Sequence, residues 1–198
     1  MSNGFSLASQ SLKNHYLLMR HGHSEANLAG RIVSTPARGV GGCGLSARGR
    51  DQLVEVLAGW RWARPQRVVH SDFLRTTETA ERIARHFGLG LEADTRLRER
   101  HFGDLEGERD ARYAEVWARD SRDSAHRYAG VESVVAVAAR MMAVIEELER
   151  AHAGETLLLV SHGDPLQILL TALEGRDLAR HREREPLAPA SITPLRRP

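Results

Sequence analysis

The sequence contains a single cysteine, Cys43, among 198 residues. One cysteine can build neither a disulfide framework nor a cysteine-based zinc site within one chain. Long hydrophobic runs are also missing, since no stretch reaches the roughly 18 apolar residues of a membrane span. The first fifteen residues lack the basic start and apolar core of a signal peptide. We therefore expect a cytoplasmic protein with no membrane partner.

The chain has little net charge. Its 28 Lys and Arg residues stand against 26 Asp and Glu residues, which gives a formal net charge of +2. The two signs alternate in segments such as EELER (146–150) and HREREP (181–186), which is typical of solvated helix faces. A protein that wraps nucleic acid needs a basic track along the phosphates. The sequence therefore predicts no nucleic-acid partner.

Length and patterning indicate one α/β domain. The chain is long enough to bury a core without disulfides or metals, and we expect a flexible leader over 1–15 and a single domain over 16–198. Short apolar runs predict strands at 16–19, 67–70, 156–160 and, more weakly, 191–195. Amphipathic patterns predict helices over 46–63, 73–87 and 132–152, and a further helix at DPLQ (164–167) with Asp164 as its cap.

Strands that alternate with helices of this length predict a mostly parallel sheet with helices on both faces, a three-layer sandwich. The stretch from about 100 to 130 is charged and weakly periodic. We predict that it forms a small helical insertion over the active site.

Cationic and titratable residues follow three of the predicted strands. Arg20 and His21 follow the first strand, Arg75 comes shortly after the second, and His162 follows the third. Ligands in open α/β sheets collect beyond the carboxyl ends of the strands, so these side chains are expected to meet at one edge. Two arginines and two histidines near helix N-termini suit a compact anion such as a phosphoryl group.

Four motifs in order carry a resemblance to a known family. They are LMRHGHSEAN (18–27), SDFLRTTETA (71–80), LRERHFGDLEG (97–107) and LVSHG (159–163). Together they resemble the histidine phosphatase superfamily, the phosphoglycerate mutase-like fold. The resemblance covers about residues 16–195, and each motif lies in the strand-to-helix context that the family requires.

The resemblance implies catalytic roles. His21 is expected to be the nucleophile that is transiently phosphorylated, because an imidazole with a pKa of about 6.5 is largely neutral near pH 7 and needs no separate base. His162, as an imidazolium, together with Arg20 and Arg75, is expected to donate to the phosphoryl oxygens. Glu99 is expected to protonate the leaving oxygen and then to take a proton from water.

The predicted substrate-binding set adds three smaller residues to Arg20, Arg75 and His162. Ser24 and Asn27 match polar positions after the nucleophile, and Gly163 lies beside His162. For Ser24 and Asn27 the alternative is a helix cap with no ligand role. Further candidates are Arg31 for a second anionic group of the substrate and, from the insertion, the wall residues Tyr113, Trp117 and Tyr128, for which core packing is the alternative.

Two departures from the mutases of the family favour hydrolysis. The segment after the nucleophile, GRIVSTPARGVGGCGLSARG (30–49), lacks the mutases' Trp-Asp pair, and the region after the acid motif is short and free of proline. A mutase must exclude water with an extended lid. We therefore predict a phosphomonoesterase for small phosphorylated metabolites, with a cofactor-dependent phosphoglycerate mutase as the alternative.

Two other functions are compatible with parts of the pattern. His21, His23 and His162 with a carboxylate could form a metal site, but neighbouring arginines disfavour a cation. A non-catalytic module that binds a phosphorylated ligand would be expected to have lost His21 or Glu99. Both residues are present, so we expect an enzyme that needs neither a metal nor another cofactor.

Overall fold

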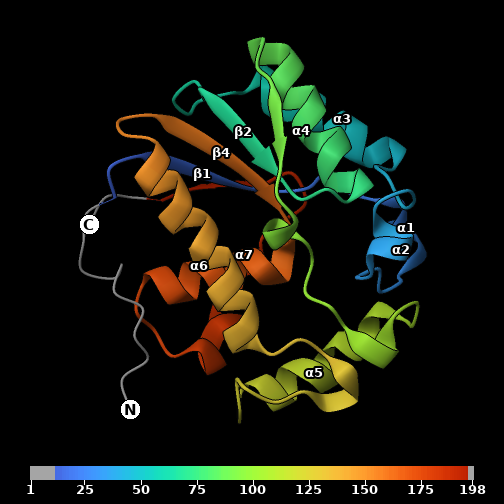
Figure 1. Cartoon of the computed structure of the whole chain (residues 1–198). Helices are drawn as coiled ribbons and strands as arrows, with labels where there is room; N and C mark the ends of the chain where they lie inside the picture. Colours follow the sequence, from blue (N-terminus) through green and yellow to red (C-terminus); the bar gives the residue numbers. More distant parts are fainter. Residues whose placement is uncertain (1–11, 196–198) are drawn as a thin grey trace.

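A five-stranded sheet forms the centre of the computed structural model, which describes residues 12–195 (Figure 1). Its strand order is β3-β2-β4-β1-β5, and only β5 runs antiparallel to its neighbour. The strands are β1 (His15–Arg20), β2 (Arg67–His70), β3 (Leu91–Ala93), β4 (Thr156–Ser161) and β5 (Ile192–Pro194). The predicted mostly parallel sheet is confirmed.

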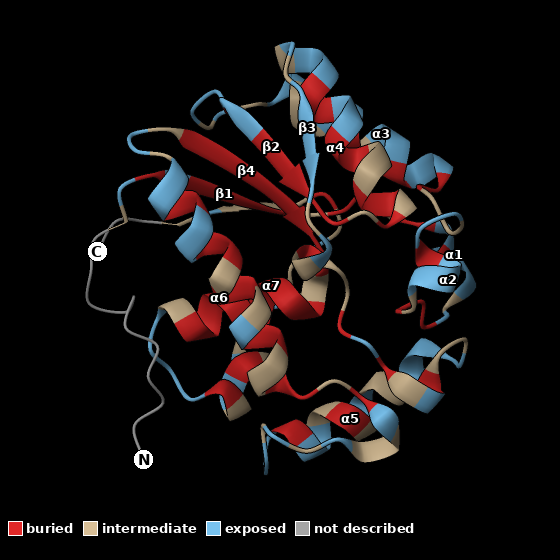
Figure 2. Ribbon diagram, in the orientation of Figure 1, coloured by how far each residue is buried: buried red, intermediate tan, exposed pale blue. Residues whose placement is uncertain are grey.

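Helices cover both faces of this sheet, as predicted (Figures 1 and 2). On one face the core contains side chains from α3 and α4, and on the other it contains side chains from α6 and α7. The longer helices are α3 (Ala47–Ala58), α4 (Leu74–Phe87), α5 (Tyr113–Asp120), α6 (Val134–Ala151) and α7 (Gly163–Leu173), and the short ones are α1 (Glu25–Ala29) and α2 (Pro36–Gly39).

The two central strands explain why the sheet is parallel and buried. Every residue of β4 is buried, and Tyr16–Met19 of β1 are buried as well. Such continuous apolar strands are typical of parallel sheets covered on both faces. Their register pairs Arg20 with Ser161, so the residues that follow, His21 and His162, leave the sheet side by side.

Three details differ from the sequence-based predictions. Strand β3 was not predicted, because it is a short edge strand whose three residues are all exposed. Helix α3 ends at Ala58 instead of continuing to residue 63. The predicted cap Asp164 lies instead inside the first turn of α7, whose N-cap is His162. The Asp164 carboxylate bonds the buried Arg100 guanidinium at 3.3 Å, so it does not bond the helix end.

Only the last residues of the predicted leader, 1–15, lie in the described part of the chain. Residues 1–11 lie outside the described part of the chain. Residues 13–15 belong to the domain: the backbone N–H groups of Lys13 and Asn14 donate to the Glu149 carboxylate at 2.6 and 3.2 Å, and His15 begins β1. The domain therefore begins before residue 16.

The segment from 100 to 130 is helical, as predicted. It contains α5 and the short 3₁₀ turns Gly103–Leu105, Asp110–Arg112 and Tyr128–Gly130. It has its own apolar cluster, in which Phe102, Leu105 and Val116 pack with Ile32 and Val131. This cluster lets a polar segment hold a defined position beside the carboxyl edge of the sheet (Figure 1).

Helix α6 and the turn before it, Tyr128–Ala151, are long and apolar enough to cross a membrane by length and composition. Half of that segment's apolar window is buried inside the domain. Its buried side chains, among them Val137, Met141 and Ile145, pack in the core beside the sheet. The apolarity of α6 is therefore explained by core packing.

We predict that Gly49→Ala destabilises the protein although alanine is the better helix former. A Cβ at Gly49 would collide with the carbonyl oxygen of His23, and overpacking of this kind costs about 1–3 kcal/mol. Thermal or urea unfolding measures the loss. Gly59→Ala is the matched control, because a Cβ there meets only Glu55 O at 3.4 Å. Equal stability of the two variants would contradict the close approach.

Candidate active site

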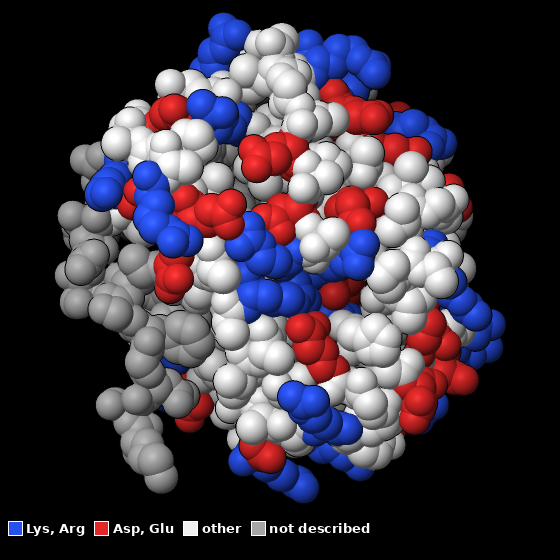
Figure 3. Space-filling view, in the orientation of Figure 1, with Lys and Arg blue, Asp and Glu red and all other residues white. Residues whose placement is uncertain are grey.

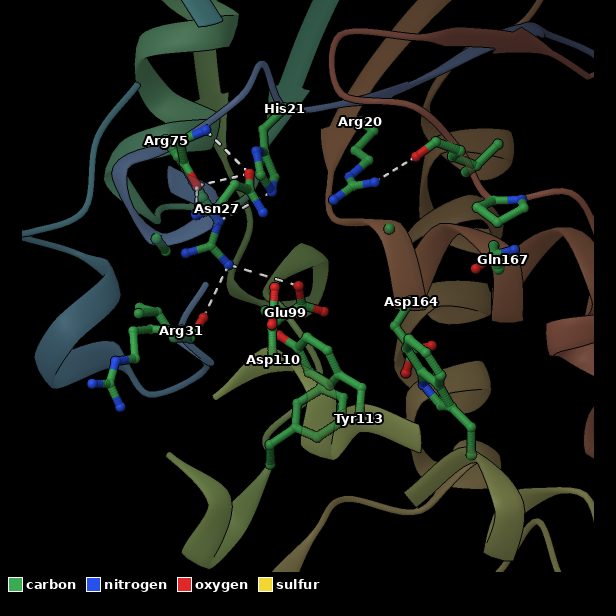
Figure 4. Close-up of a pocket in the computed structure, with 18 of the residues that line it drawn as sticks. Arg20, His21, Asn27, Arg31, Arg75, Glu99, Asp110, Tyr113, Asp164 and Gln167 are labelled. Carbon is green, nitrogen blue, oxygen red and sulfur yellow. Dashed lines mark hydrogen bonds and ion pairs between the residues drawn. The ribbon is translucent and has the colours of Figure 1, made fainter. Parts of the chain in front are cut away.

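A cavity of about 240 Å³ lies at the carboxyl ends of the central strands, beside the insertion. Figure 4 shows His21, Asn27 and Arg75 on one side of it and Arg20, Asp164 and Gln167 on the opposite side. Glu99 lies between these two groups, at about the height of Asp164, and Asp110 and Tyr113 lie lower in this view. The structure thus brings Arg20, His21, Arg75 and Glu99 to one cavity, as predicted.

The two ring nitrogens of His21 have different partners. Its Nδ1 lies 2.7 Å from the carbonyl oxygen of Gly22, and its Nε2 lies 3.2 Å from Nε of Arg75. The Gly22 carbonyl can only accept a hydrogen bond, and the Arg75 N–H can only donate one. Nδ1 therefore carries the ring proton, and Nε2 holds the lone pair. Burial, followed by the charges of Arg75 and Arg20, lowers the pKa of His21 well below its ordinary value. The ring is therefore a neutral base.

The ring of His162 lies edge-to-face beside that of His21. Its ring centroid is 5.2 Å from that of His21, and its Nε2 is 2.9 Å from Oγ of Ser71. The ring is fully buried and does not line the cavity itself. Burial, followed by the charge of Arg75, lowers the pKa of His162 well below its ordinary value. With only protein groups around it the ring is neutral, so the expected imidazolium requires the negative charge of a phosphoryl group to form.

Three buried nitrogen atoms at this site have no hydrogen-bond partner among residues 12–195. They are Nε of Arg20, Nη1 of Arg75 and Nδ1 of His162. The remaining donors fix the arginines, because Nη1 of Arg20 donates to the carbonyl of Leu187 at 2.5 Å and Nη2 of Arg75 donates to that of Val33 at 3.1 Å. Buried polar atoms without partners are rare and costly. A tetrahedral oxyanion would accept from the two arginine N–H groups, and from Nδ1 of His162 when that ring is protonated.

Glu99 supplies a carboxyl group with an unusual pKa. Burial, assisted by the charge of Asp164, raises the pKa of Glu99 to about 7, although Arg75 and Arg20 act in the opposite direction. Its Oε2 is 3.7 Å from Nη2 of Arg75 and 3.8 Å from Nδ1 of His162. A carboxyl group that is half protonated near neutral pH can both give and take a proton.

Ser24 and Asn27 form the reciprocal cap of α1. Oγ of Ser24 accepts from the backbone of Asn27 at 3.2 Å, and Oδ1 of Asn27 accepts from the backbone of Ser24 at 3.1 Å. Both residues also line the cavity. Ser24 thus has the capping role, whereas the hydrogen bonds of the described residues leave the Asn27 Nδ2 group for a ligand. At Gly163, which lines the cavity as well, a Cβ would meet Nε of Arg20 at 3.3 Å.

Of the other candidates from the sequence, some line the cavity and one does not. Tyr113 and Trp117 line the cavity. Tyr128 does not, because it packs against the guanidinium of Arg119, whose central carbon is 3.6 Å from the ring centroid. Arg31 reaches the rim, where its Nη1 donates to the carbonyl of Gly107 at 3.2 Å, and its guanidinium points away from His21 and Glu99 (Figure 4).

Several wall residues were not predicted, namely Asp110, Asp164, Gln167, Arg182 and Leu187. Four of them come from α7 and the segment after it. In that segment Arg182 lies over the Trp117 ring at 3.7 Å and bonds Gln167. The alternating charges of 181–186 resemble a solvated helix face. The one sequence feature that could have indicated these wall residues is that their segment connects the helix after His162 to the last strand.

No group of three His, Cys, Asp or Glu side chains within residues 12–195 is arranged to hold a metal ion. His23, which a metal site would have needed, bonds Oγ of Ser46 at 2.8 Å through its Nδ1. The donors that do converge are cationic or N–H groups. The described site is therefore built for an anion.

Comparison with known proteins identifies the family. The family model of the histidine phosphatase superfamily, branch 1, matches residues 16–197. The chain belongs to this superfamily. The resemblance noted in the four motifs is thereby confirmed.

Named relatives of this histidine phosphatase include hydrolases and a mutase. It is 33% identical over 172 residues to a glucosyl-3-phosphoglycerate phosphatase of Mycobacterium tuberculosis (strain CDC 1551 / Oshkosh). The alignment covers 79% of this chain and 74% of the relative. It is 34% identical over 172 residues to a probable phosphoglycerate mutase, GpmB, of Photorhabdus laumondii subsp. laumondii. That alignment covers 84% of this chain and 77% of the relative.

A solved structure of the same kind supports the fold and the chemistry. A mycobacterial glucosyl-3-phosphoglycerate phosphatase in complex with VO3 superposes with a TM-score of 0.78 at 30% identity, over 92% of each chain. The predicted α/β fold and the assignment to a phosphatase of this superfamily, a phosphoric monoester hydrolase, are confirmed.

We predict that orthovanadate raises the melting temperature of the protein and that Arg75→Met removes most of this effect. Ligand at 100 times its Kd stabilises the folded state by about 2.7 kcal/mol, and Nη1 of Arg75 is one of the unpartnered donors. Differential scanning fluorimetry with increasing vanadate gives the shift for each protein. Arg85→Met, on the exposed part of α4, is the control. An unchanged vanadate shift in Arg75→Met would contradict the anion site.

Proposed function

We propose that this chain hydrolyses phosphomonoesters through a phosphohistidine on His21, in two half-reactions. One observation carries the proposal. The lone pair of the neutral Nε2 of His21 lies in a site with a carboxyl group whose pKa is about 7 and with three buried nitrogens that have no partner within residues 12–195. A nucleophile, an oxyanion site and an acid are the three parts that phosphoryl transfer to histidine requires.

In the first half-reaction, Nε2 of His21 attacks phosphorus and the P–O bond to the leaving group breaks. Glu99 gives its proton to the leaving oxygen. Arg20, Arg75 and His162 donate to the equatorial oxygens, where negative charge is concentrated, and removal of one such donor typically costs about 2.7–4 kcal/mol of transition-state stabilisation. The carbonyl of Gly22 holds the Nδ1 proton and stabilises the positive charge of the phosphorylated ring.

In the second half-reaction, a water molecule attacks the phosphohistidine and the N–P bond breaks. The Glu99 carboxylate takes a proton from that water, which regenerates the acid. The electron pair returns to Nε2 of His21, and inorganic phosphate leaves. The raised pKa of Glu99 suits both steps, because the group must be protonated in one and ionised in the other.

The substrate is a small phosphorylated molecule, since the cavity is about 240 Å³ in volume. The names of the relatives make glucosyl-3-phosphoglycerate the first compound to assay and phosphoglycerate the mutase control. Figure 3 shows basic and acidic side chains interspersed on the face in view, which supports neither a nucleic-acid nor a membrane partner. We place the reaction in the cytoplasm on the composition of the chain, with no metal or other cofactor.

We predict that His21→Ala lowers kcat/KM for phosphomonoesters by roughly 10³-fold or more, as expected when a covalent nucleophile is removed. Rapid acid-free quenching of wild-type protein with ³²P-labelled substrate is expected to trap label on His21, assigned by peptide mapping. The variant is expected to bind vanadate and to trap no label. Turnover by His21→Ala at the wild-type rate would reject the nucleophile. Exchange between 2- and 3-phosphoglycerate that is faster than hydrolysis would reverse the preference for a phosphatase.

The pH profile tests the acid. Because the raised pKa of Glu99 is about 7, kcat/KM for an alkyl phosphate is expected to fall above that pH, about tenfold per unit, as the proton of the acid is lost. Glu99→Gln is expected to lose this alkaline limb together with most of the activity. A limb that persists in Glu99→Gln would assign it to another group.

A further inference from the structure

Arg100, the residue after the proposed acid, is fully buried and does not line the cavity. Its Nη1 and Nη2 donate to the two carboxylate oxygens of Asp120 at 2.7 and 2.8 Å, a bidentate pair in which both side chains have no exposed surface. Asp120 is the last residue of α5, in the insertion. This ion pair therefore ties the residue after Glu99 to the end of α5, and Arg100 also contacts Asp164 of α7 at 3.3 Å.

The same arginine also holds the segment that carries Glu99. Its backbone N–H donates to Oε1 of Glu99 at 3.0 Å, and its Nε donates to the carbonyl of Glu132 at 2.7 Å. From α6, Arg140 donates to the carbonyls of Arg98 at 2.8 Å and Glu99 at 3.3 Å. The backbone on both sides of the acid is thus fixed by guanidinium groups.

Stability alone does not account for a buried ion pair. Replacement of such a pair by apolar residues of similar volume is often neutral or stabilising, because the desolvation cost of both charges disappears. What a bidentate arginine–carboxylate pair provides is a fixed orientation. A general acid needs such orientation, because a displacement of about 1 Å at the reacting groups can cost about 100-fold in rate.

We propose that the Arg100–Asp120 ion pair is a positioning device for Glu99, through which the insertion sets the direction of the carboxyl group that protonates the leaving oxygen. Neither residue touches the substrate. The proposal rests on the role of Glu99 as the general acid. It assigns to the insertion a part in catalysis in addition to its part in forming the cavity wall.

The dependence on the leaving group tests this proposal. Arg100→Met/Asp120→Leu removes both charges of the pair. The Asp164 carboxylate loses its 3.3 Å contact with Arg100 but keeps His181 and Arg182, each at 3.5 Å. The measurement is kcat/KM, which reports the first half-reaction, for glycerol phosphate, whose alkoxide needs a proton, and for p-nitrophenyl phosphate, whose phenoxide leaves without one. We expect the double variant to lose at least about 10-fold on glycerol phosphate and less than about 3-fold on p-nitrophenyl phosphate.

Controls separate positioning from general damage. Ile83→Val, in the core on the opposite face of the sheet, is expected to lower the melting temperature without changing the ratio of the two activities. If the double variant does not fold, Asp120→Glu, which keeps the charge and shifts the pair, is measured in the same way. An equal loss on both substrates, in whichever variant folds, would overturn the positioning role.

Glu99→Gln is measured alongside and distinguishes this inference from the proposed function. If Glu99→Gln discriminates between the two substrates and the ion-pair variants do not, only the positioning role is wrong. If Glu99→Gln lowers both activities equally, the role of Glu99 as general acid is wrong, and the positioning role fails with it.

Discussion

The site depends on the parallel pairing of β1 with β4. Their register puts Arg20 level with Ser161, and the backbone N–H of His21 continues the ladder by donating to the carbonyl of Ser161 at 3.0 Å. The two imidazoles therefore leave neighbouring strands at the same height, 5.2 Å apart. The pairing of β1 with β4 thus makes neighbours of two residues that are 141 positions apart in the sequence.

Burial then gives the titratable groups opposite and complementary properties. Removal from water disfavours the charged form of every group, so it lowers the pKa of His21 and His162 and raises that of Glu99. The arginines reinforce the first effect and oppose the second. Burial of one cavity thus keeps His21 neutral and Glu99 partly protonated near neutral pH. It also leaves buried nitrogen atoms without a partner within the described part of the protein.

Much of this could be predicted from the sequence, because the signals were local. The strands 67–70 and 156–160 are short apolar runs, and the histidines and arginines at their ends belong to motifs with a fixed order. The interactions that could not be predicted are long-range ones. Arg100 has no local feature that pairs it with Asp120, twenty positions later, and the contact of Arg182 with Trp117 depends on how two surface segments fold over the cavity. Asp164 lies in a sequence typical of a helix cap, but its carboxylate bonds the buried guanidinium of Arg100. Sequence periodicity does not reveal that charge.

The segment that follows α7 returns to the strand that carries Arg20 and leads to His21. The backbone of Ala190 donates to the carbonyl of His21 at 3.0 Å, Arg20 donates to the carbonyl of Ser191 at 3.1 Å, and the Arg20 side chain is held by Leu187. His21 thus follows a strand, β1, that lies between β4 and β5 in the sheet. The described segment after α7 therefore completes the surroundings of Arg20 and His21, although these two residues lie near the opposite end of the described chain.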